Sequence, residues 1–514
     1  MSAQAETPPA LGPLLAAHWR RVLALLFLGF SAGLPILLIF SSLSLWLREA
    51  GVSRSAVTFF SWAALGYSFK FVWAPLVDKL PIPLLSAWLG RRRAWLLLAQ
   101  LAVIAALFGM ASQDPASAGL ATLAVAAVAL GFSSATQDIV IDAYRIEVGD
   151  SDVQALLSAT YVAGYRIGML VAGAGALYLA AGFGSTMDHY NYEAWANTYR
   201  IMALCMGIGI VTTFCLGEPE LPDTGSTYDY GVSDYVRFVA LFVALVTAFI
   251  VTFIVLGNPL DSLKAAWHSG DKATDAVKSF ALGTARMALC LLCALGAGRL
   301  LVRLGAVPYS MLYDTYIAPT EDFIRRYGRL ALWVLVLIGT YRIADIVMGA
   351  VSNVFYADMG YDKQTIASVT KVFGLLMTIA GGLIGGVACL RWGVLRLLFA
   401  GALLTAATNI AFMWLASGEP SIVKLAIVIG ADNFSAGLAS AAFIAWLSAL
   451  TSIQFTATQY AVYSSLMTLF PKLLGGYAGG AVDTVGYSGF FLGTALLGVP
   501  VLLLILWLGR KKLV

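Results

Sequence analysis

Charged side chains that share one face of an apolar helix are the most informative feature of the sequence. Asp138, Asp142 and Arg145 end a long apolar run, in the stretch GFSSATQDIVIDAYR, at spacings of four and three residues. They therefore lie on one stripe of a helix. An ionised side chain in membrane hydrocarbon costs about 2.5 kcal/mol or more, so such residues face a bundle interior or a wet cavity. The stripe predicts a solute pathway or a proton relay.

The composition places this stripe in a polytopic membrane protein. The chain has 514 residues, of which 60% are hydrophobic and 12% charged, and no soluble globule of this size has that balance. The net charge of +4 is spread over loops, which argues against nucleic-acid binding. The five cysteines lie in apolar segments, so we expect buried thiols with neither a disulfide framework nor a metal site.

Motifs for catalysis are missing from the sequence. The three histidines lie outside the apolar runs, and the chain contains no HExxH, nucleophile elbow or P-loop. We therefore expect no enzyme activity and no cofactor, although a membrane-embedded enzyme remains the main alternative to a transporter.

Fourteen apolar runs have about the length that crosses a bilayer as a helix. They cover residues 22–46, 57–76, 94–111, 120–144, 155–181, 195–216, 236–256, 280–301, 330–356, 365–390, 394–416, 423–450, 456–481 and 490–508. Six runs precede a central pair and six follow it. We expect an N-terminal six-helix half (1–217), a central insert with two extra helices (218–304) and a C-terminal six-helix half (305–514).

The two sets of six show signs of an internal repeat. LREAGVSRSAVTFF (47–60) follows the first run, and YADMGYDKQTIASV (356–369) follows the ninth, each with a glycine and a polar turn between membrane runs. Two parallel six-helix halves describe the major facilitator fold, which binds its solute near the midplane between the halves. The alternative is chance similarity between hydrophobic helices.

The distribution of basic residues predicts the orientation. Lys and Arg concentrate in the loops that lie inside when the N-terminus is inside, including the loop of Arg91, Arg92 and Arg93. Under the positive-inside rule, both termini are then cytoplasmic.

The loop between the second and third runs, VDKLPIPLLSAWLGRRR (77–93), adds an acid to this basic cluster. Asp78, Gly90 and Arg91 to Arg93 match the outline of a loop that major facilitator proteins carry at this place, with a longer insertion. The resemblance implies that Asp78, Arg91, Arg92 and Arg93 latch the cytoplasmic helix ends in one conformation. A plain positive-inside cluster is the alternative.

Several ordered segments resemble the AmpG muropeptide permeases. They are SAGLPILL (31–38), YSFKFVWAPLVD (67–78), GRRRAWLLL (90–98), TQDIVIDAYR (136–145), DNFSAGLASAAFIAWLSAL (432–450) and FTATQYAVYSSL (455–466). The eukaryotic acetyl-CoA transporters share part of the TQD signature, and such an organic-anion transporter is the alternative. The central pair of runs, 236–256 and 280–301, contains no strong motif of the AmpG permeases.

This resemblance implies proton-driven import of anhydromuropeptides from periplasm to cytoplasm for cell-wall recycling, with a link to β-lactam resistance in some bacteria. It implies a multi-pass protein of the bacterial inner membrane. We expect a monomer whose partners are the small-molecule substrate, protons and the lipid bilayer.

The residues offer the groups that such a substrate needs. Cations suit its carboxylates, amides suit its hydroxyl and acetamido groups, and aromatic rings suit its sugars. The candidate substrate-binding residues are Lys70, Gln137, Tyr161, Tyr165, Arg166, Arg342, Asn433, Gln459 and Tyr460. Lys70 could instead snorkel to the interface, Arg342 could form a structural pair with Asp345, and the aromatic and amide groups could simply pack or join helices.

Proton coupling requires a carboxyl that changes protonation state during the cycle, and burial favours the protonated form. Asp138 is the deeper acid of the stripe and our first candidate. Asp142, nearer Arg145, could instead hold a structural ion pair, and Asp345 is the next candidate.

Overall fold

The computed structural model describes residues 11–52, 60, 65–117, 120–149, 153–186, 188–219, 231–267, 272–361, 363–475 and 478–511. Within these ranges every regular element is a helix, and eleven helical segments are long and apolar enough to cross a membrane. The all-helical membrane fold is thereby confirmed. The expected count of fourteen spans stays a prediction, and much of the expected span 57–76 lies outside the described residues.

Contacts divide the chain into two compact units. The first joins Met1–Pro222 to Phe323–Val514, and the second is Asp223–Asp322. We call the parts of the first unit up to Pro222 and from Phe323 the N half and the C half. The expected insert, 218–304, falls largely within the second unit, which continues 18 residues further, to Asp322.

The N half is built from long helices interrupted by short π and 3-10 turns. Its elements are α1 (Leu11–Leu37), η1 (Leu38–Ser42), α2 (Leu43–Glu49), α4 (Leu65–Phe69), η3 (Lys70–Val72), α5 (Ala74–Lys79), α6 (Leu85–Leu89), α7 (Arg91–Ala111), α8 (Leu120–Val148), α9 (Gln154–Leu170), η4 (Val171–Gly175), α10 (Ala176–Gly182), α11 (Tyr192–Cys205) and α12 (Gly207–Cys215).

The C half begins within α17 (Ala318–Tyr327) and ends with α25 (Ala478–Arg510), which is kinked at Gly486, where the backbone is not helical (φ 69°). Its further elements are η6 (Gly328–Leu330), α18 (Ala331–Thr340), α19 (Ile343–Asp358), α20 (Lys363–Ile366), η7 (Ala367–Phe373), α21 (Gly374–Trp392), α22 (Val394–Ala416), α23 (Ile422–Leu450), η8 (Ile453–Phe455) and α24 (Thr456–Gly475). The expected span 330–356 is not continuous, because the helix is interrupted at Tyr341 and Arg342. This break bears on the site described below.

The second unit contains a helical hairpin that satisfies its own interior charge. Helices α13 (Val232–Val255) and α15 (Lys272–Arg303) pack together, with α14 (Gly257–Ala266) between them in sequence, and α16 (Tyr309–Leu312) and η5 (Tyr313–Ile317) follow. Arg286 donates to the Phe253 carbonyl and covers the Phe253 ring at 3.6 Å. The Arg286 guanidinium is therefore hydrogen-bonded within the hairpin itself.

Glycines bring α1 and α9 into backbone contact. A Cβ at Gly29 would overlap the carbonyl of Tyr161, and a Cβ at Gly164 would overlap the carbonyl of Leu26. Small residues at such crossings are how membrane helices pack closely. The packing fixes the backbone of α9 and so positions Tyr161 and its neighbours.

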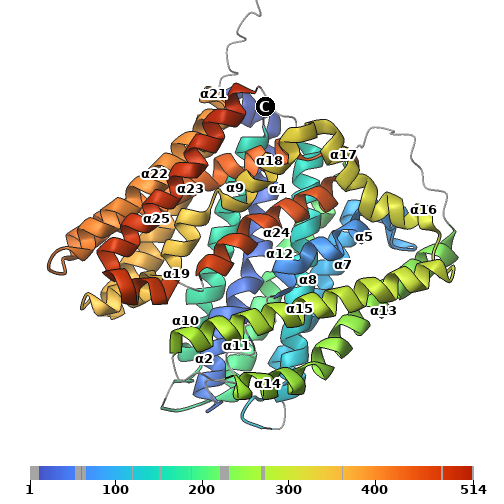
Figure 1. Ribbon diagram of the computed structural model, residues 1–514, viewed down its shortest axis with the longest axis horizontal. Coiled ribbons are helices and arrows are strands. Elements are labelled where there is room, and N and C mark those ends of the chain that lie inside the picture. Colours follow the sequence, from blue (N-terminus) through green and yellow to red (C-terminus); the bar gives the residue numbers. More distant parts are fainter. Residues whose placement is uncertain are drawn as a thin grey trace, which may run out of the picture. The chain divides into compact units, whose positions relative to one another are not determined.

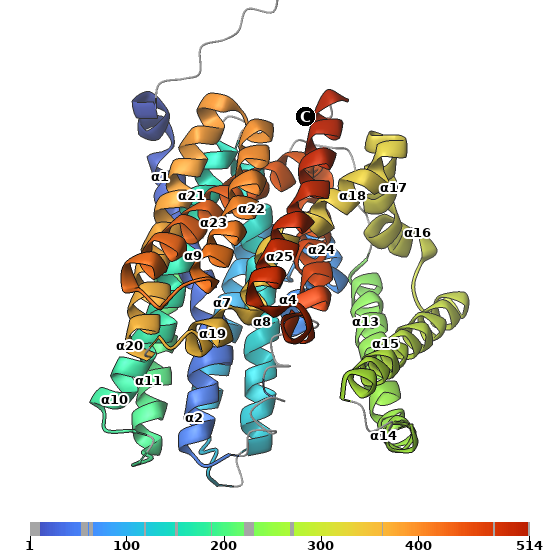
Figure 2. The same cartoon turned by 60° about the vertical axis from the view of Figure 1, so that its left-hand side comes forward.

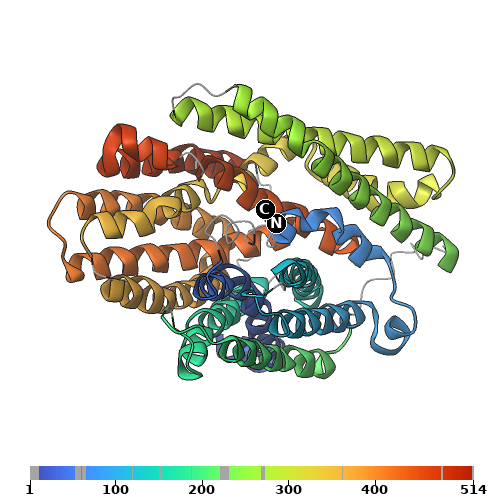
Figure 3. The same cartoon turned by 90° about the horizontal axis from the view of Figure 1, so that it is seen from below.

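Two helices carry most of the packing between the halves. Helix α9 packs on α21 and α23, and α24 packs on α5 and α8. Figure 1 shows α24 running beside α8 and α5, and Figure 2 shows α21, α22, α23 and α25 grouped in the C half. In Figure 3 the blue-to-teal helices of the N half and the orange-to-red helices of the C half form two groups that meet centrally. Side chains at this meeting line form the site.

Candidate functional site

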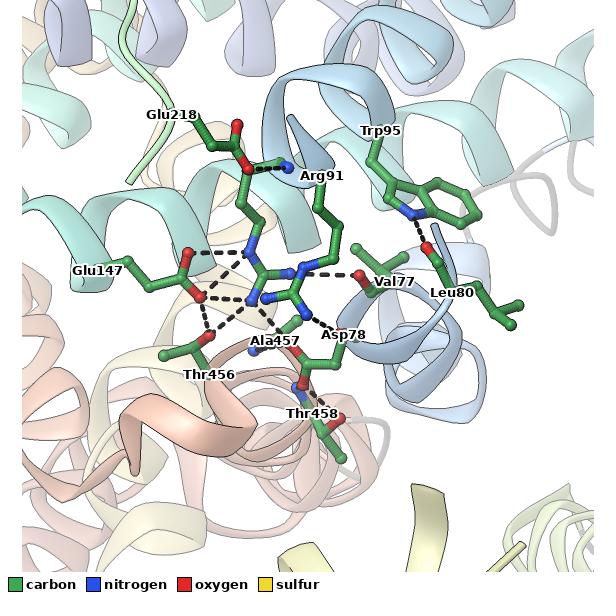
Figure 4. A network of polar contacts seen from close by, with 11 residues as sticks. Val77, Asp78, Leu80, Arg91, Trp95, Glu147, Glu218, Thr456, Ala457 and Thr458 are labelled. Carbon is green, nitrogen blue, oxygen red and sulfur yellow. Dashed lines mark hydrogen bonds and ion pairs between the residues drawn. The ribbon is translucent and has the colours of Figure 1, made fainter. Parts of the chain in front are cut away.

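A buried network of polar contacts joins the halves at one end of the helices (Figure 4). Arg92, at the start of α7, donates to Glu147 at 2.9 Å, to Asp78 at 2.8 Å and to the Thr456 hydroxyl at 2.8 Å. The Asp78 carboxylate in turn accepts from the backbone N–H groups of Ala457 at 3.0 Å and Thr458 at 2.6 Å. We call Asp78, Arg92, Glu147, Thr456 and Thr458 the interhalf network.

The network places an anion at a helix N-terminus. Thr456 begins α24, so the N–H groups that Asp78 accepts from are among those with no partner inside the helix. Asp78 thus caps a helix of the C half with a side chain of the N half. This contact stabilises the arrangement in which the halves are closed at this end.

Asp78 stays charged at neutral pH. Burial by itself would raise the pKa of its carboxyl, but Arg92 and the Thr458 hydroxyl outweigh burial and hold the pKa below its usual value. The stability that such a carboxylate contributes is complete above the usual carboxyl pKa and is lost only as pH falls through the lowered value. The cap therefore does not titrate near neutral pH and is unsuited to proton coupling.

The neighbouring arginines serve the N half itself. Arg91 donates to the Asp78 backbone carbonyl at 2.6 Å, and Arg93 donates to the Thr213 carbonyl at 3.2 Å. Glu218 caps α7 by accepting from the N–H groups of Arg92 at 2.7 Å and Arg93 at 3.1 Å. Gly90 precedes α7 with φ +87°, and any Cβ there would collide with Glu218. The three arginines therefore make different contacts. Arg91 and Arg93 bond carbonyls of the N half, whereas Arg92 also bonds Thr456 of the C half.

A second polar group, the central cluster, surrounds the acidic stripe of α8. It consists of Lys70, Asp138, Asp142, Arg145, Tyr161 and Tyr460. Asp142 lies 3.5 Å from the Lys70 ammonium and 3.5 Å from the Arg145 guanidinium. Lys70 is buried and does not snorkel to a surface. Asp142 is thus held between two cations.

Arg145 ties this cluster to both halves. Its guanidinium donates to Ser158 of α9 at 2.8 Å and to Ser448 of α23 at 2.7 Å, and it lies 5.1 Å from the Tyr460 ring centroid. The side chain is fully buried, so its charge depends on these partners and on Asp142.

Asp138 has a different environment from Asp142. Its Oδ1 atom is buried and has no hydrogen-bond partner in the described part of the chain. Lys70 and Asp142 act on it only at longer electrostatic range. A buried carboxylate without a close partner is costly, whereas the protonated acid is not, so Asp138 has the environment that a proton-binding group requires.

A third group of candidates comes from α9 and from the break between α18 and α19. Tyr165 and Arg166 of α9 are half-buried, and Tyr165 lies 6.1 Å from the Tyr161 ring. Arg166 lies within electrostatic range of Arg342 and Asp345. Arg342 bonds Asp345, and their side chains are 24% and 20% exposed. The guanidinium groups of Arg166 and Arg342, one from each half, therefore act on one another electrostatically.

The three amides predicted to bind substrate are bonded within the protein. Gln137 is fully buried and donates to Ser31 at 3.2 Å, while its Oε1 has no partner in the described residues. Gln459 accepts from Arg326 and from the Ser452 N–H, both at 2.8 Å. Asn433 accepts from Thr378 at 3.0 Å. Substrate contact by Gln459 would require its bonds to break when the halves separate.

Gln137→Ala is expected to weaken substrate binding by about twofold to twelvefold, the effect of one hydrogen bond worth about 0.5–1.5 kcal/mol. The free Oε1 is the acceptor that the substrate would use. Binding to the purified protein measures this, with Gln100→Ala as the matched control, since Gln100 is an equally buried amide with a free Nε2. Unchanged affinity in both variants, with equal losses of thermal stability, would assign Gln137 to helix packing alone.

Several residues of the site are not evident from the sequence. Glu147 lies two residues after Arg145, and its side chain is fully buried against Arg92. Thr456 and Thr458 lie more than 360 residues from Arg92 and Asp78. The place of Glu147 beside the TQDIVIDAYR stretch could have suggested it, but the two threonines carry no comparable signal.

Comparison with solved structures supports the fold. The major facilitator proton:xylose symporter XylE superposes with a TM-score of 0.57 at 13% identity, covering 95% of each chain. The human organic anion transporter MFSD10 gives 0.53 at 13% identity, covering 97% of this chain and 100% of that one. At these identities the likeness establishes the fold alone.

Comparison with known sequences is more specific. AmpG 4 of Rickettsia felis is 31% identical over 491 residues, covering 96% of this chain and 97% of that protein. The anhydromuropeptide permease of Escherichia coli K12 is 28% identical over 484 residues, covering 94% and 78%. The family described as acetyl-coenzyme A transporter 1 matches residues 21–205.

The fold is that of the major facilitator class, with buried charges bonded between its two halves. Within that class the chain belongs to the AmpG family, as the full-length similarity shows. The family predicted from the ordered sequence segments is thereby confirmed.

Proposed function

We propose that this protein imports anhydromuropeptides from the periplasm into the cytoplasm by proton symport, for recycling of the cell wall. The observation that carries this proposal is the similarity to the E. coli anhydromuropeptide permease along 94% of the chain. In this proposal the protein is a monomer of the bacterial inner membrane, free of cofactors, with both termini in the cytoplasm.

The chemistry of the site suits a sugar that carries carboxylates. Arg166 and Arg342 offer cations from opposite halves, and Tyr161 and Tyr165 offer two rings on α9 whose centroids lie 6.1 Å apart. Guanidinium groups pair well with carboxylates, and the rings of sugar-binding sites are commonly aromatic. Asp138 supplies a carboxyl without a close partner for the proton.

The interhalf network indicates which state of the transport cycle this is. It lies at the end of the helices that carries Arg91 to Arg93, which the positive-inside rule assigns to the cytoplasm. In alternating access the central site opens to one side of the membrane at a time. With the cytoplasmic end closed, solute would reach the site from the periplasm. In our proposal this conformation therefore receives solute from the periplasm.

Uptake in cells tests the proposal. A permease-deficient E. coli strain that expresses this protein should accumulate labelled anhydromuropeptide, and an uncoupler should abolish the accumulation. Expression of Asp483→Asn, which changes an exposed acid of α25, should support normal uptake. Failure of wild-type protein to accumulate the compound at normal membrane expression would overturn the substrate assignment.

The match to the acetyl-coenzyme A transporter family over residues 21–205 favours one second candidate, an organic-anion substrate such as a coenzyme A thioester. Competition separates the two candidates. Under our proposal, excess acetyl-coenzyme A should leave muropeptide uptake into proteoliposomes unchanged, whereas under the alternative the protein should take up labelled acetyl-coenzyme A and no muropeptide.

A further inference from the structure

The segment that joins α23 to α24 receives several of the contacts that close the halves at one end. We call residues 450–459 the α23–α24 corner, which contains the end of α23, η8 and the first turn of α24. Besides Asp78 and Arg92, the N half contacts this corner through Lys79, whose ammonium lies 4.8 Å from the Phe455 ring centroid. The corner must therefore hold one shape for the halves to close on it.

Arg326 of α17 bridges the two helices that meet at the corner. Its guanidinium donates to the Leu450 carbonyl and to the Gln459 Oε1 atom, both at 2.8 Å. Leu450 is the last residue of α23, so its carbonyl has no partner within that helix. The planar guanidinium, with its fixed fork of donors, thus joins the end of α23 to the first turn of α24.

Gln459 extends this bridge along the corner. Its Oε1 atom also accepts from the Ser452 N–H at 2.8 Å, and the Ser452 carbonyl accepts from the Phe455 N–H at 3.0 Å. Gln459 is buried, and Arg326 and Ser452 both belong to the C half. The amide therefore spans the residues between the two helices and organises the corner from within its own half.

Aromatic packing keeps Arg326 at the corner. The Phe323 ring of α17 is buried, and its centroid lies 5.6 Å from that of Tyr463 in α24. Tyr327 lies 4.9 Å from the Phe323 ring, and the Arg326 guanidinium lies 5.2 Å from the Tyr327 centroid. The turn of α17 that carries Arg326 is thus packed on the helix whose first turn it holds.

We propose that Arg326 and Gln459 are positioning residues, which hold the α23–α24 corner in the shape that Asp78 binds. With the bridge in place, the N–H groups of Ala457 and Thr458 are already ordered when Asp78 approaches. Without it, the corner must be ordered each time the halves close, at a cost in conformational entropy. The role in transport rests on the proposed function, whereas the effect on closure does not.

Distances between spin labels test the effect on closure without any substrate. Labels at Trp88 of α6 and Trp392 of α21, both exposed, are introduced into purified protein whose five cysteines are replaced. Arg326→Gln and Gln459→Leu should each lower the ratio of closed to open molecules by about fivefold, the effect of two hydrogen bonds at the lower end of their usual strength. Arg329→Gln removes a nearby exposed arginine and should leave the ratio unchanged.

A double-mutant cycle then shows whether the bridge acts through Asp78. Asp78→Ala removes the carboxylate that the corner binds. Adding Arg326→Gln to it should lower the ratio by less than about twofold further, because the contact to be positioned is already lost. A full fivefold effect in both backgrounds would overturn the proposal, as would an unchanged ratio in both Arg326→Gln and Gln459→Leu.

Transport separates positioning from solute binding at Gln459. Gln459→Glu keeps an acceptor for Arg326 and for the Ser452 N–H, so closure and transport should stay near wild type. Gln459→Leu should lower the maximal rate while muropeptide affinity changes by less than about twofold. Loss of affinity in both variants with closure intact would assign Gln459 to the solute and overturn the proposal. If closure responds as expected but no muropeptide is carried, the proposed function fails and the positioning role stands.

Discussion

Asp138→Asn is expected to abolish accumulation of substrate against a gradient, reducing the inside-to-outside ratio to about one, while binding persists. The asparagine reproduces the size and neutrality of the protonated acid but cannot release a proton. The cycle would then lose the step in which the charged and neutral forms favour different conformations. Uptake into proteoliposomes with an imposed pH gradient measures the ratio, and exchange between equal pools should persist independently of pH.

The geometry explains why Asp138, and not its neighbour, is the expected group. Asp142 lies between Lys70 and Arg145, so Asp142→Asn would leave two buried cations uncompensated. Removing one partner of a buried ion pair costs about 3–5 kcal/mol, so we expect that variant to lose thermal stability as well as transport. Uncoupler-sensitive accumulation by Asp138→Asn at wild-type levels would place the coupling in Asp142 or in the C half.

Asp78→Asn is expected to lower the maximal transport rate by about tenfold or more while changing substrate affinity by less than about twofold. The carboxylate bonds the first turn of α24, which belongs to the C half, and also pairs with Arg92 of its own half. The contacts with α24 exist only while the halves are closed at this end, so their loss destabilises that arrangement. Since about 1.4 kcal/mol is tenfold in an equilibrium, loss of several such bonds shifts the balance between the two conformations strongly. Initial rates and equilibrium binding on the same purified protein give the two numbers.

Arg93→Gln is the matched control for the interhalf network. Arg93 is adjacent to Arg92 but bonds the end of α12 in its own half, so this variant should keep a rate near wild type. Arg92→Gln should behave like Asp78→Asn. A large loss of affinity at an unchanged rate in Asp78→Asn would show that the network belongs to the binding site and does not control the cycle.

The membrane helices and the acidic stripe could be predicted because both are local properties of the sequence. Hydropathy identifies apolar runs, and helical spacing places Asp138, Asp142 and Arg145 on one face. The break at Tyr341 and Arg342 could not be predicted from hydropathy, since the flanking residues remain apolar.

The partners of the candidate residues are set by long-range packing, so they could not be predicted from the sequence. Asp78 and Arg92 were predicted as a latch from their loop, but the partner threonines lie in a helix near the other end of the chain. Spacing along one helix reveals a shared face, and it cannot reveal which face of another helix will meet it.

The most direct test of the central claim is proton movement with substrate in proteoliposomes that contain only this protein. Adding anhydromuropeptide outside, with no gradient imposed, should make the external medium more alkaline as protons enter with the solute. Asp138→Asn should show no such change at equal protein density and orientation. Muropeptide entry without any alkalinisation, or alkalinisation that persists in Asp138→Asn, would contradict proton symport through this carboxyl.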